Sequence, residues 1–308
     1  RTVEQTMKCV IATTKPFLPT ARDEMIQMME AAGIEVAVLE KYTERAELLD
    51  AIKDANAVII RSDKIKADCL EAAPGLKLVV RGGAGTDNVD PDVKGKIVVE
   101  NTPGMNACGV AELAIGMIIS LARNNFNGKA GVELSSLTLG LHAFGYVGKH
   151  MARIASKWMK VIAYDPFLKP EDFAEHGVTP VASPEELYKQ ADIVSLHMPH
   201  IKGVTTGIVN KDLLGLMKPG SFVINTARKE VVNEVDMLAK LKEEPTFKYG
   251  TDVAPDNKDE MEAVDKFRFF ATCKKQGAQT AESNARCGIA GAKQVIAFLT
   301  EDKILNKV

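Results

Sequence analysis

The sequence has little of what marks secreted, membrane-bound or nucleic-acid-binding proteins. Its five cysteines are odd in number and widely scattered, which excludes a disulfide framework and zinc-ligand spacing and is typical of a reducing cytosol. No apolar run is long enough to span a membrane, and the N-terminal residues lack the apolar segment of a signal peptide. A net charge of −2 gives no reason to expect nucleic acid or a membrane surface as a partner. We therefore expect a cytoplasmic protein that acts on small molecules.

What is present is an alternation of short apolar runs and amphipathic segments, in a chain of 308 residues that is long enough for two cores. Strands that alternate with helices indicate parallel sheets. The strands expected in the first half are Cys9–Ala12, Val36–Leu39, Ala57–Ile60, Leu76–Val80 and Ile97–Val99. Those expected in the second half are Leu137–Ala143, Val161–Tyr164, Ile193–Leu196, Phe222–Ile224, Tyr249–Val253 and a short run at Arg268–Ala271. The sequence thus predicts an α/β fold of two doubly wound parallel-sheet domains with a cleft between them, comprising residues 1–103 plus 281–308 and residues 104–280.

The most specific pattern begins at the run that ends on Ala143. Gly145 and Gly148 follow in the spacing Ala-x-Gly-x-x-Gly, and a helical pattern, a second apolar run and Asp165 come next. This is the order of a dinucleotide-binding βαβ unit, in which glycines let backbone N–H groups approach a pyrophosphate and the carboxylate binds the ribose hydroxyls. Ala143 stands where the first glycine is usual, and its Cβ is harmless only if the local φ is negative.

Three other features bear on binding and packing. The fourth run leads into a glycine-rich turn, Arg81–Gly85, at the end of a strand where open α/β sheets bind ligands. Val110–Ala122 is apolar nearly all round, so we expect a helix that is buried between domains or in a subunit interface. We interpret His142, which lies within a strand, as a hydrogen-bonded core histidine and not as a catalyst.

The chain resembles the D-isomer-specific 2-hydroxyacid dehydrogenase family over about residues 8–300. The matching stretches occur in the family's order and are RGGAGTDNVD (81–90), NTPGMNACGVAELAIGMIISLAR (101–123), LGLHAFGYVGKHMA (139–152), VIAYDP (161–166), ADIVSLHMP (191–199), NTARKEVVNEVDML (225–238), TDVAP (251–255) and GAQTAESN (277–284). The resemblance implies a flavodoxin-like substrate domain, a Rossmann domain for NAD, and a homodimer. Within the family the chain is most similar to members that oxidise D-3-phosphoglycerate to 3-phosphohydroxypyruvate, the first step of phosphorylated serine biosynthesis, in the short form without a C-terminal regulatory domain.

The resemblance also implies roles for individual residues. Arg228 binds the substrate carboxylate and polarises the 2-keto oxygen, a task for which a planar guanidinium is suited. The turn with Gly82 and Gly83 offers backbone N–H groups to the same carboxylate. The residues implied to hold NAD are Gly145, Tyr146, Val147, Asp165, His197, Pro199, Thr226, Ala227 and Asp252.

Two expectations come from the charges themselves. Arg61 ends a strand, so we expect it to join Lys64 and Arg81 in a cationic pocket for a substrate phosphate. Asp165 should favour NAD over NADP, because a carboxylate repels a 2′-phosphate and no arginine follows it directly.

Departures from the family pattern concern the acid–base residues. The family's catalytic histidine lies two residues before the glycine that corresponds to Gly277, and this chain has Lys275 there, with Lys274 beside it. The family's catalytic glutamate is absent, and Asp256 is the carboxylate that could substitute from a shifted position. We expect Lys275 to act as the acid/base, and we expect burial beside Arg228 to lower its pKa.

Three functions therefore stay open. The first is oxidation of a phosphorylated 2-hydroxy acid with NAD. The second is a dehydrogenase or reductase for an unphosphorylated acid such as glycerate, glyoxylate or lactate. The third is a non-catalytic NAD(H)-sensing interaction protein, favoured by the loss of the histidine and of the glutamate. A further departure from the family pattern is Lys229 and Glu230 in place of the two glycines usual after the arginine.

Overall fold

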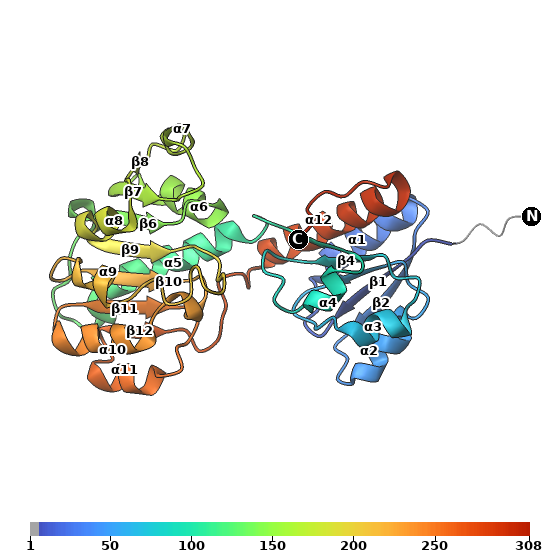
Figure 1. The fold of residues 1–308 in the computed structure, drawn as a ribbon, viewed down its shortest axis with the longest axis horizontal. Coiled ribbons are helices and arrows are strands. Elements are labelled where there is room, and N and C mark those ends of the chain that lie inside the picture. Colours follow the sequence, from blue (N-terminus) through green and yellow to red (C-terminus); the bar gives the residue numbers. More distant parts are fainter. Residues whose placement is uncertain (1–5) are drawn as a thin grey trace, which may run out of the picture. The chain divides into compact units, whose positions relative to one another are not determined.

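A computed structural model describes residues 6–308 and divides into two compact units (Figure 1). The first unit contains the residues up to Asn106 together with Gln279–Val308, and the second is Ala107–Ala278. These limits lie within three residues of the expected domain boundaries, except that residues 1–5 lie outside the described part of the chain. None of the helices described between residues 6 and 308 has the length and apolar content that crossing a membrane requires.

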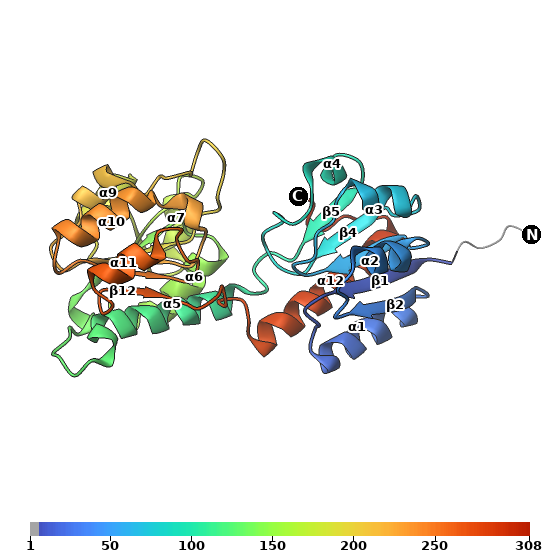
Figure 2. The same ribbon diagram turned by 90° about the horizontal axis from the view of Figure 1, so that it is seen from below.

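The first unit is a five-stranded parallel sheet with helices on both faces (Figure 2). Its strands, in the sheet order β2-β1-β3-β4-β5, are β1 (Lys8–Thr13), β2 (Glu35–Glu40), β3 (Ala57–Ile60), β4 (Leu78–Arg81) and β5 (Val98–Asn101). Its helices are α1 (Pro19–Ala31), α2 (Arg45–Ile52), α3 (Ala67–Ala72), α4 (Pro91–Lys94) and α12 (Ala281–Glu301). Successive strand residues face opposite sides, so Val10 packs with Leu48 of α2 while Ile11 packs with Met25 of α1 and Val295 of α12. Burial on both faces explains why these strands are continuous apolar runs.

The second unit is a seven-stranded parallel sheet in the order β12-β11-β10-β9-β6-β7-β8. Its strands are β6 (Thr138–His142), β7 (Lys160–Tyr164), β8 (Thr179–Pro180), β9 (Ile193–Leu196), β10 (Phe222–Asn225), β11 (Lys248–Thr251) and β12 (Phe269–Ala271). Its α-helices are α5 (Ala107–Ala122), α6 (Tyr146–Ala155), α7 (Pro170–Ala174), α8 (Pro184–Gln190), α9 (Lys211–Gly215), α10 (Glu234–Glu243) and α11 (Lys258–Val264), and short 3₁₀ turns occur at Asn124–Phe126, Leu134–Ser136 and Lys229–Val231. One face of the sheet packs on α5 and α6 and the other on α8 to α11. The expected α/β fold with two parallel sheets is therefore confirmed.

Helix α5 buries most of its apolar side chains within its own unit. Ala114, Ile118 and Leu121 are fully buried in the core beneath the sheet. Glu112 and Gly116 are exposed on the opposite side of the helix. The expected burial is thus explained by packing inside the second unit, and a subunit interface on this helix stays a prediction.

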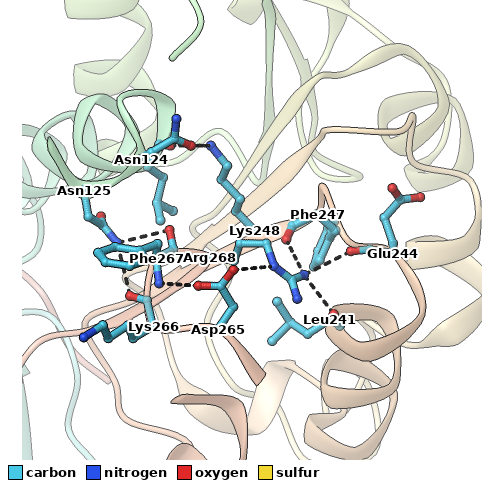
Figure 3. Close-up of polar contacts among 11 residues, drawn as sticks. Asn124, Asn125, Leu241, Glu244, Phe247, Lys248, Asp265, Lys266, Phe267 and Arg268 are labelled. Carbon is cyan, nitrogen blue, oxygen red and sulfur yellow. Dashed lines mark hydrogen bonds and ion pairs between the residues drawn. The ribbon is translucent and has the colours of Figure 1, made fainter. Parts of the chain in front are cut away.

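A polar network fixes the end of α5 against the outer strands of this sheet (Figure 3). The Lys248 ammonium donates to the carbonyl of Leu121 at 2.6 Å and to the side-chain oxygen of Asn124 at 2.8 Å, and partial burial lowers the pKa of Lys248. The Asn125 amide donates to the carbonyl of Phe267 at 3.2 Å. Asn124 and Asn125 have φ of 50° and 51°, a left-handed conformation that asparagine tolerates better than most residues. The network therefore anchors the chain where it leaves α5.

Candidate active site

The candidate residues of the second unit all follow the carboxyl ends of parallel strands, which meet at one edge of the sheet. The strands and the residues beyond them are β6 with Gly145, β7 with Asp165, β9 with His197, β10 with Arg228, β11 with Asp252 and β12 with Lys275. Strand β6 lies between β7 and β9, so the chain runs from it first in one direction and then in the other. Open α/β sheets bind their ligands at such a switch point.

The glycine turn after β6 contains three residues in different settings: Ala143 has a strained backbone, Gly145 has free space around its Cα, and Gly148 packs closely on the strand. Ala143 has a φ of 78°, the unfavourable sign for a residue with a Cβ. A Cβ on Gly148 would lie 2.8 Å from the carbonyl oxygen of Ala143, so only glycine lets α6 approach the strand. Gly145 has an ordinary φ of −74° and no atom within 4 Å of its would-be Cβ. Nothing in the described chain therefore requires glycine at 145, and the space above it is open to a ligand.

The start of α6 and Asp165 provide the groups that a dinucleotide needs. Gly145 is the N-cap of α6 and has no side chain that could accept a hydrogen bond from the first turn. The first N–H groups of α6 are therefore suited to bind an anionic ligand. The Asp165 carboxylate accepts the N–H of Phe144 at 2.9 Å and the N–H of Phe167 at 3.0 Å. It retains further lone pairs for two ribose hydroxyls. Tyr146 is exposed at this end of α6, whereas Val147 is half-buried and packs on the core.

Two histidines lie beneath this edge: His142 is buried, and His197 is partly buried with its ring nitrogens shielded from solvent. The His142 ring lies 3.2 Å from the Tyr188 hydroxyl, which confirms that it is a hydrogen-bonded core histidine. Burial lowers the pKa of His142 to about 4 and that of His197 to about 3. Both ring nitrogens of His197 are buried without a hydrogen-bond partner in the described part of the chain. Pro199 is exposed, and its carbonyl accepts the Thr205 hydroxyl at 2.7 Å.

The loop after β10 is organised by Asn225, which the sequence analysis did not single out. Its side-chain oxygen accepts the N–H of Ala227 at 2.9 Å and its amide donates to the carbonyl of Arg228 at 2.9 Å. Arg228 also donates to the carbonyl of Ala227 at 3.0 Å. The Thr226 hydroxyl is buried and has no partner among residues 6–308. The sequence signal for this role was an asparagine directly after an apolar strand run, because asparagine side chains bond to the backbone that follows them.

Asp252 holds the segment that carries Lys275. One of its carboxylate oxygens accepts the Thr272 hydroxyl and the N–H of Gln276, both at 2.9 Å, and the other accepts the N–H of Gly277 at 2.9 Å. Asp252 is only 1% exposed, so these bonds are protected from water. Its expected contact with a nicotinamide carboxamide would have to share an oxygen with this loop.

The acid–base candidates differ from expectation in two respects. Lys275 and its neighbour Lys274 are exposed, so the expected burial of Lys275 is wrong. The Asp256 carboxylate lies 2.5 Å from the Lys229 ammonium and raises the pKa of Lys229. The Asp256 side chain is 81% exposed, unlike a buried catalytic carboxylate. Asp256 thus joins the loops after β10 and β11 through an ion pair.

In the first unit, Arg61 is partly engaged by the chain itself. Its guanidinium donates to the carbonyls of Lys15 at 2.8 Å and Pro16 at 3.1 Å, and it lies 5.5 Å from the centre of the Phe17 ring. Burial lowers the pKa of Arg61. Lys64 is exposed. Its other terminal nitrogen donates to the side-chain oxygen of Gln279 at 3.5 Å, so an anion at this strand end would have to share or replace that contact.

The glycine turn after β4 already uses two of the N–H groups expected to bind a carboxylate. Gly82 donates to the carbonyl of Ile60 at 2.8 Å and Gly83 donates to the Thr102 hydroxyl at 2.6 Å. Gly83 has a φ of 136°, and a Cβ on it would lie 1.6 Å from a guanidinium nitrogen of Arg81. The N–H groups of Gly82 and Gly83 are thus already bonded within the first unit, and the binding of a carboxylate by this turn stays a prediction.

Comparison with known proteins agrees with this geometry. Residues 116–271 match the NAD binding domain of the D-isomer specific 2-hydroxyacid dehydrogenases. A solved structure of NAD⁺-bound 3-phosphoglycerate dehydrogenase from Entamoeba histolytica is 41% identical, with a TM-score of 0.88 and 98% of each chain covered. Human D-3-phosphoglycerate dehydrogenase is 32% identical over 88% of this chain and 53% of its own length. Hydroxypyruvate reductase from Thermotoga maritima is 34% identical over 83% of this chain and 88% of its own. The chain thus spans about half the length of the curated phosphoglycerate dehydrogenases it matches.

Proposed function

Since the chain belongs to the D-isomer specific 2-hydroxyacid dehydrogenase family, we propose that it transfers hydride between NAD and a D-2-hydroxy acid. The observation that carries this proposal is the edge of the second sheet, where the open Gly145, the free start of α6 and the Asp165 carboxylate occur in the order that a dinucleotide requires. Bound there, NAD would supply the hydride acceptor. Asp165 makes NAD the preferred form, because its carboxylate would repel the 2′-phosphate of NADP.

Gly145, Tyr146 and Val147 would present the start of α6 to the pyrophosphate. The buried Thr226 hydroxyl, which lacks a partner in the described chain, fits a polar group of the cofactor. His197 offers two buried ring nitrogens, and it is uncharged at neutral pH. Ala227, Pro199 and Asp252 complete the proposed set.

The reacting groups of the substrate would meet Arg228 and Lys275. A guanidinium binds a carboxylate with two parallel hydrogen bonds and can polarise a neighbouring keto oxygen. A lysine with an ordinary pKa of about 10.4 is protonated at neutral pH, so it donates a proton readily when a keto acid is reduced. With Lys275 as the proton donor, reduction of the keto acid would be the easier direction near neutral pH. Asp256, paired with Lys229, is proposed to stabilise the neighbouring loops and not to assist Lys275.

The substrate we favour is D-3-phosphoglycerate, oxidised to 3-phosphohydroxypyruvate. The 3-phosphoglycerate dehydrogenases among the relatives support this choice, as do Arg61, Lys64 and Arg81 at the strand ends of the first unit. A second candidate is an unphosphorylated acid, because the hydroxypyruvate reductase is equally similar in sequence. The engagement of Arg61 by Lys15 and Pro16 also favours this alternative, since it leaves less of the guanidinium for a phosphate.

Absorbance of NADH with a panel of 2-keto acids separates the candidates. We expect phosphohydroxypyruvate to be reduced with a higher kcat/KM than hydroxypyruvate, glyoxylate or pyruvate, and Arg61→Ala to lower kcat/KM for the phosphorylated acid alone. Equal efficiency for phosphorylated and unphosphorylated acids would favour the second candidate. Binding of NADH without turnover of any acid would leave the non-catalytic NAD(H)-sensing role.

A further inference from the structure

The turn Arg81–Gly85 is held by the two residues at the end of the neighbouring strand β5. The Thr102 hydroxyl accepts the N–H of Gly83 at 2.6 Å, and the Thr102 N–H donates to the carbonyl of Gly83 at 3.1 Å. The Asn101 side-chain amide donates to the carbonyl of Ala84 at 2.6 Å. Three hydrogen bonds thus hold three consecutive peptide groups of the turn, 82–83, 83–84 and 84–85, against β5.

These bonds determine which groups of the turn are left for a ligand. The N–H group of Gly82 donates to the Ile60 carbonyl, and that of Gly83 donates to the Thr102 hydroxyl. The N–H groups of Ala84 and Gly85 have no acceptor within residues 6–308, and Ala84 is exposed. Successive backbone N–H groups in a turn form a concave site for an anion. Each of these N–H groups shares a planar peptide group with a carbonyl that is held: Ala84 N–H with the Gly83 carbonyl on Thr102, and Gly85 N–H with the Ala84 carbonyl on Asn101.

Asn101 is anchored by hydrogen bonds to other parts of the first unit, and Thr102 is buried. The carbonyl of Asn101 accepts the amide of Gln294, on α12, at 2.7 Å, and its N–H donates to the carbonyl of Asn306 at 3.2 Å. Thr102 is 1% exposed and Gln294 is 2% exposed. Thr102 is therefore a fixed part of the core, and the partly buried Asn101 is anchored through its backbone, so both can impose a geometry on the turn.

We infer that Asn101 and Thr102 are positioning residues for the substrate, because they orient the N–H groups of Ala84 and Gly85 toward its carboxylate. The inference rests on the proposed function, which supplies the carboxylate. Neither residue touches the substrate: the Thr102 hydroxyl and the Asn101 amide act through the backbone of the turn. The role requires an acceptor at 102 that reaches Gly83 and a donor at 101 that reaches Ala84.

Steady-state kinetics of Thr102→Val test this role with the keto acid that the wild-type protein reduces best. The substitution keeps the shape and removes the acceptor for Gly83. We expect KM for the keto acid to rise about tenfold, with kcat within about threefold, because the lost contact stabilises bound substrate and transition state alike. Affinity for NADH should be unchanged, since the cofactor residues lie in the second unit. Thr102→Ser, which restores a hydroxyl, should return KM to within about threefold of the wild-type value.

Thr13→Val is the matched control. Thr13 ends β1 in the same sheet, is fully buried, and its hydroxyl has no partner in the described chain, so KM should not change. Asn101→Ala is a second, milder test, because it removes only the donor to Ala84, and it should raise KM severalfold. If Thr102→Val does not fold, the KM of Asn101→Ala alone tests the positioning role. An unchanged KM in the folded variants of an active enzyme overturns the positioning role alone, whereas a wild type that reduces no keto acid overturns the proposed function and this role with it.

Discussion

The same substitution should affect folding at one glycine of the turn after β6 and cofactor binding at the other. In Gly148→Ala the new Cβ would lie 2.8 Å from the carbonyl oxygen of Ala143, a contact that forces the helix away from the strand. Overpacking of this kind costs about 1–3 kcal/mol. In Gly145→Ala the Cβ meets nothing within 4 Å and φ is already −74°. Alanine at a compatible glycine position stabilises by roughly 0.4–1 kcal/mol, because the unfolded chain loses freedom. Gly145 is also the N-cap of α6, where alanine is less favourable than glycine, and this offsets the gain.

Gly148→Ala and Gly145→Ala therefore distinguish an effect on thermal stability from an effect on cofactor affinity. For a unit of this size each kcal/mol shifts Tm by roughly 2–4 °C, so Gly148→Ala should melt roughly 2–12 °C below the wild type and Gly145→Ala close to it. Gly145→Ala should nevertheless weaken NAD at least tenfold, about 1.4 kcal/mol, because its methyl group fills the space through which the pyrophosphate approaches the backbone.

Differential scanning fluorimetry without ligand and titration calorimetry with NADH measure the two quantities on the same samples. Wild-type affinity in Gly145→Ala would show that the pyrophosphate does not bind above this residue. An unchanged Tm in Gly148→Ala would show that the helix does not approach Ala143 closely.

Other predictions concern the cofactor, the proton, the buried histidine and the oligomer. Asp165→Ser should narrow the preference for NAD over NADP, measured as the ratio of the two kcat/KM values, and equal efficiency in the wild type would contradict the role of Asp165. Lys275→Ala should lower kcat by about 10²–10⁴-fold while NADH still binds, whereas Lys274→Ala should have a small effect on kcat. In the wild type, the rate of hydroxy-acid oxidation should keep rising into the alkaline range, because a lysine base must first lose its proton. Burial lowers the pKa of His142 from 6.5 to about 4, so between these pH values the unfolded chain binds a proton that the folded chain does not. The free energy of unfolding is therefore highest above pH 6.5 and falls by about 1.4 kcal/mol per pH unit as the pH drops toward 4. Urea melts of His142→Gln should show a shallower loss over this window than the wild type, and His200→Gln, at an exposed histidine, should not. Light scattering at micromolar concentration should give a dimer, and a monomer would remove the expected interface on α5.

Local sequence determined the elements of this protein and where its sites would lie. Strands buried on both faces must be apolar throughout, so runs such as Ala57–Ile60 and Ile193–Leu196 could be located to the residue. Glycines and carboxylates just beyond such runs mark the carboxyl edge of a parallel sheet, as Gly145 and Asp165 do. These signals depend only on neighbouring residues, and they need no knowledge of how strands pair.

Tertiary structure decided what each site residue is bonded to. The parallel register sets Arg81 opposite Asn101, and this pairing brings Thr102 to Gly83. The Lys229–Asp256 pair likewise joins loops that follow two adjacent strands. A hydrogen bond or ion pair between residues about twenty positions apart depends on strand order, register and side-chain direction. None of these can be read from spacing along the chain, which is why the sequence could indicate the glycine turn and the acidic residue but not the partners that already occupy them.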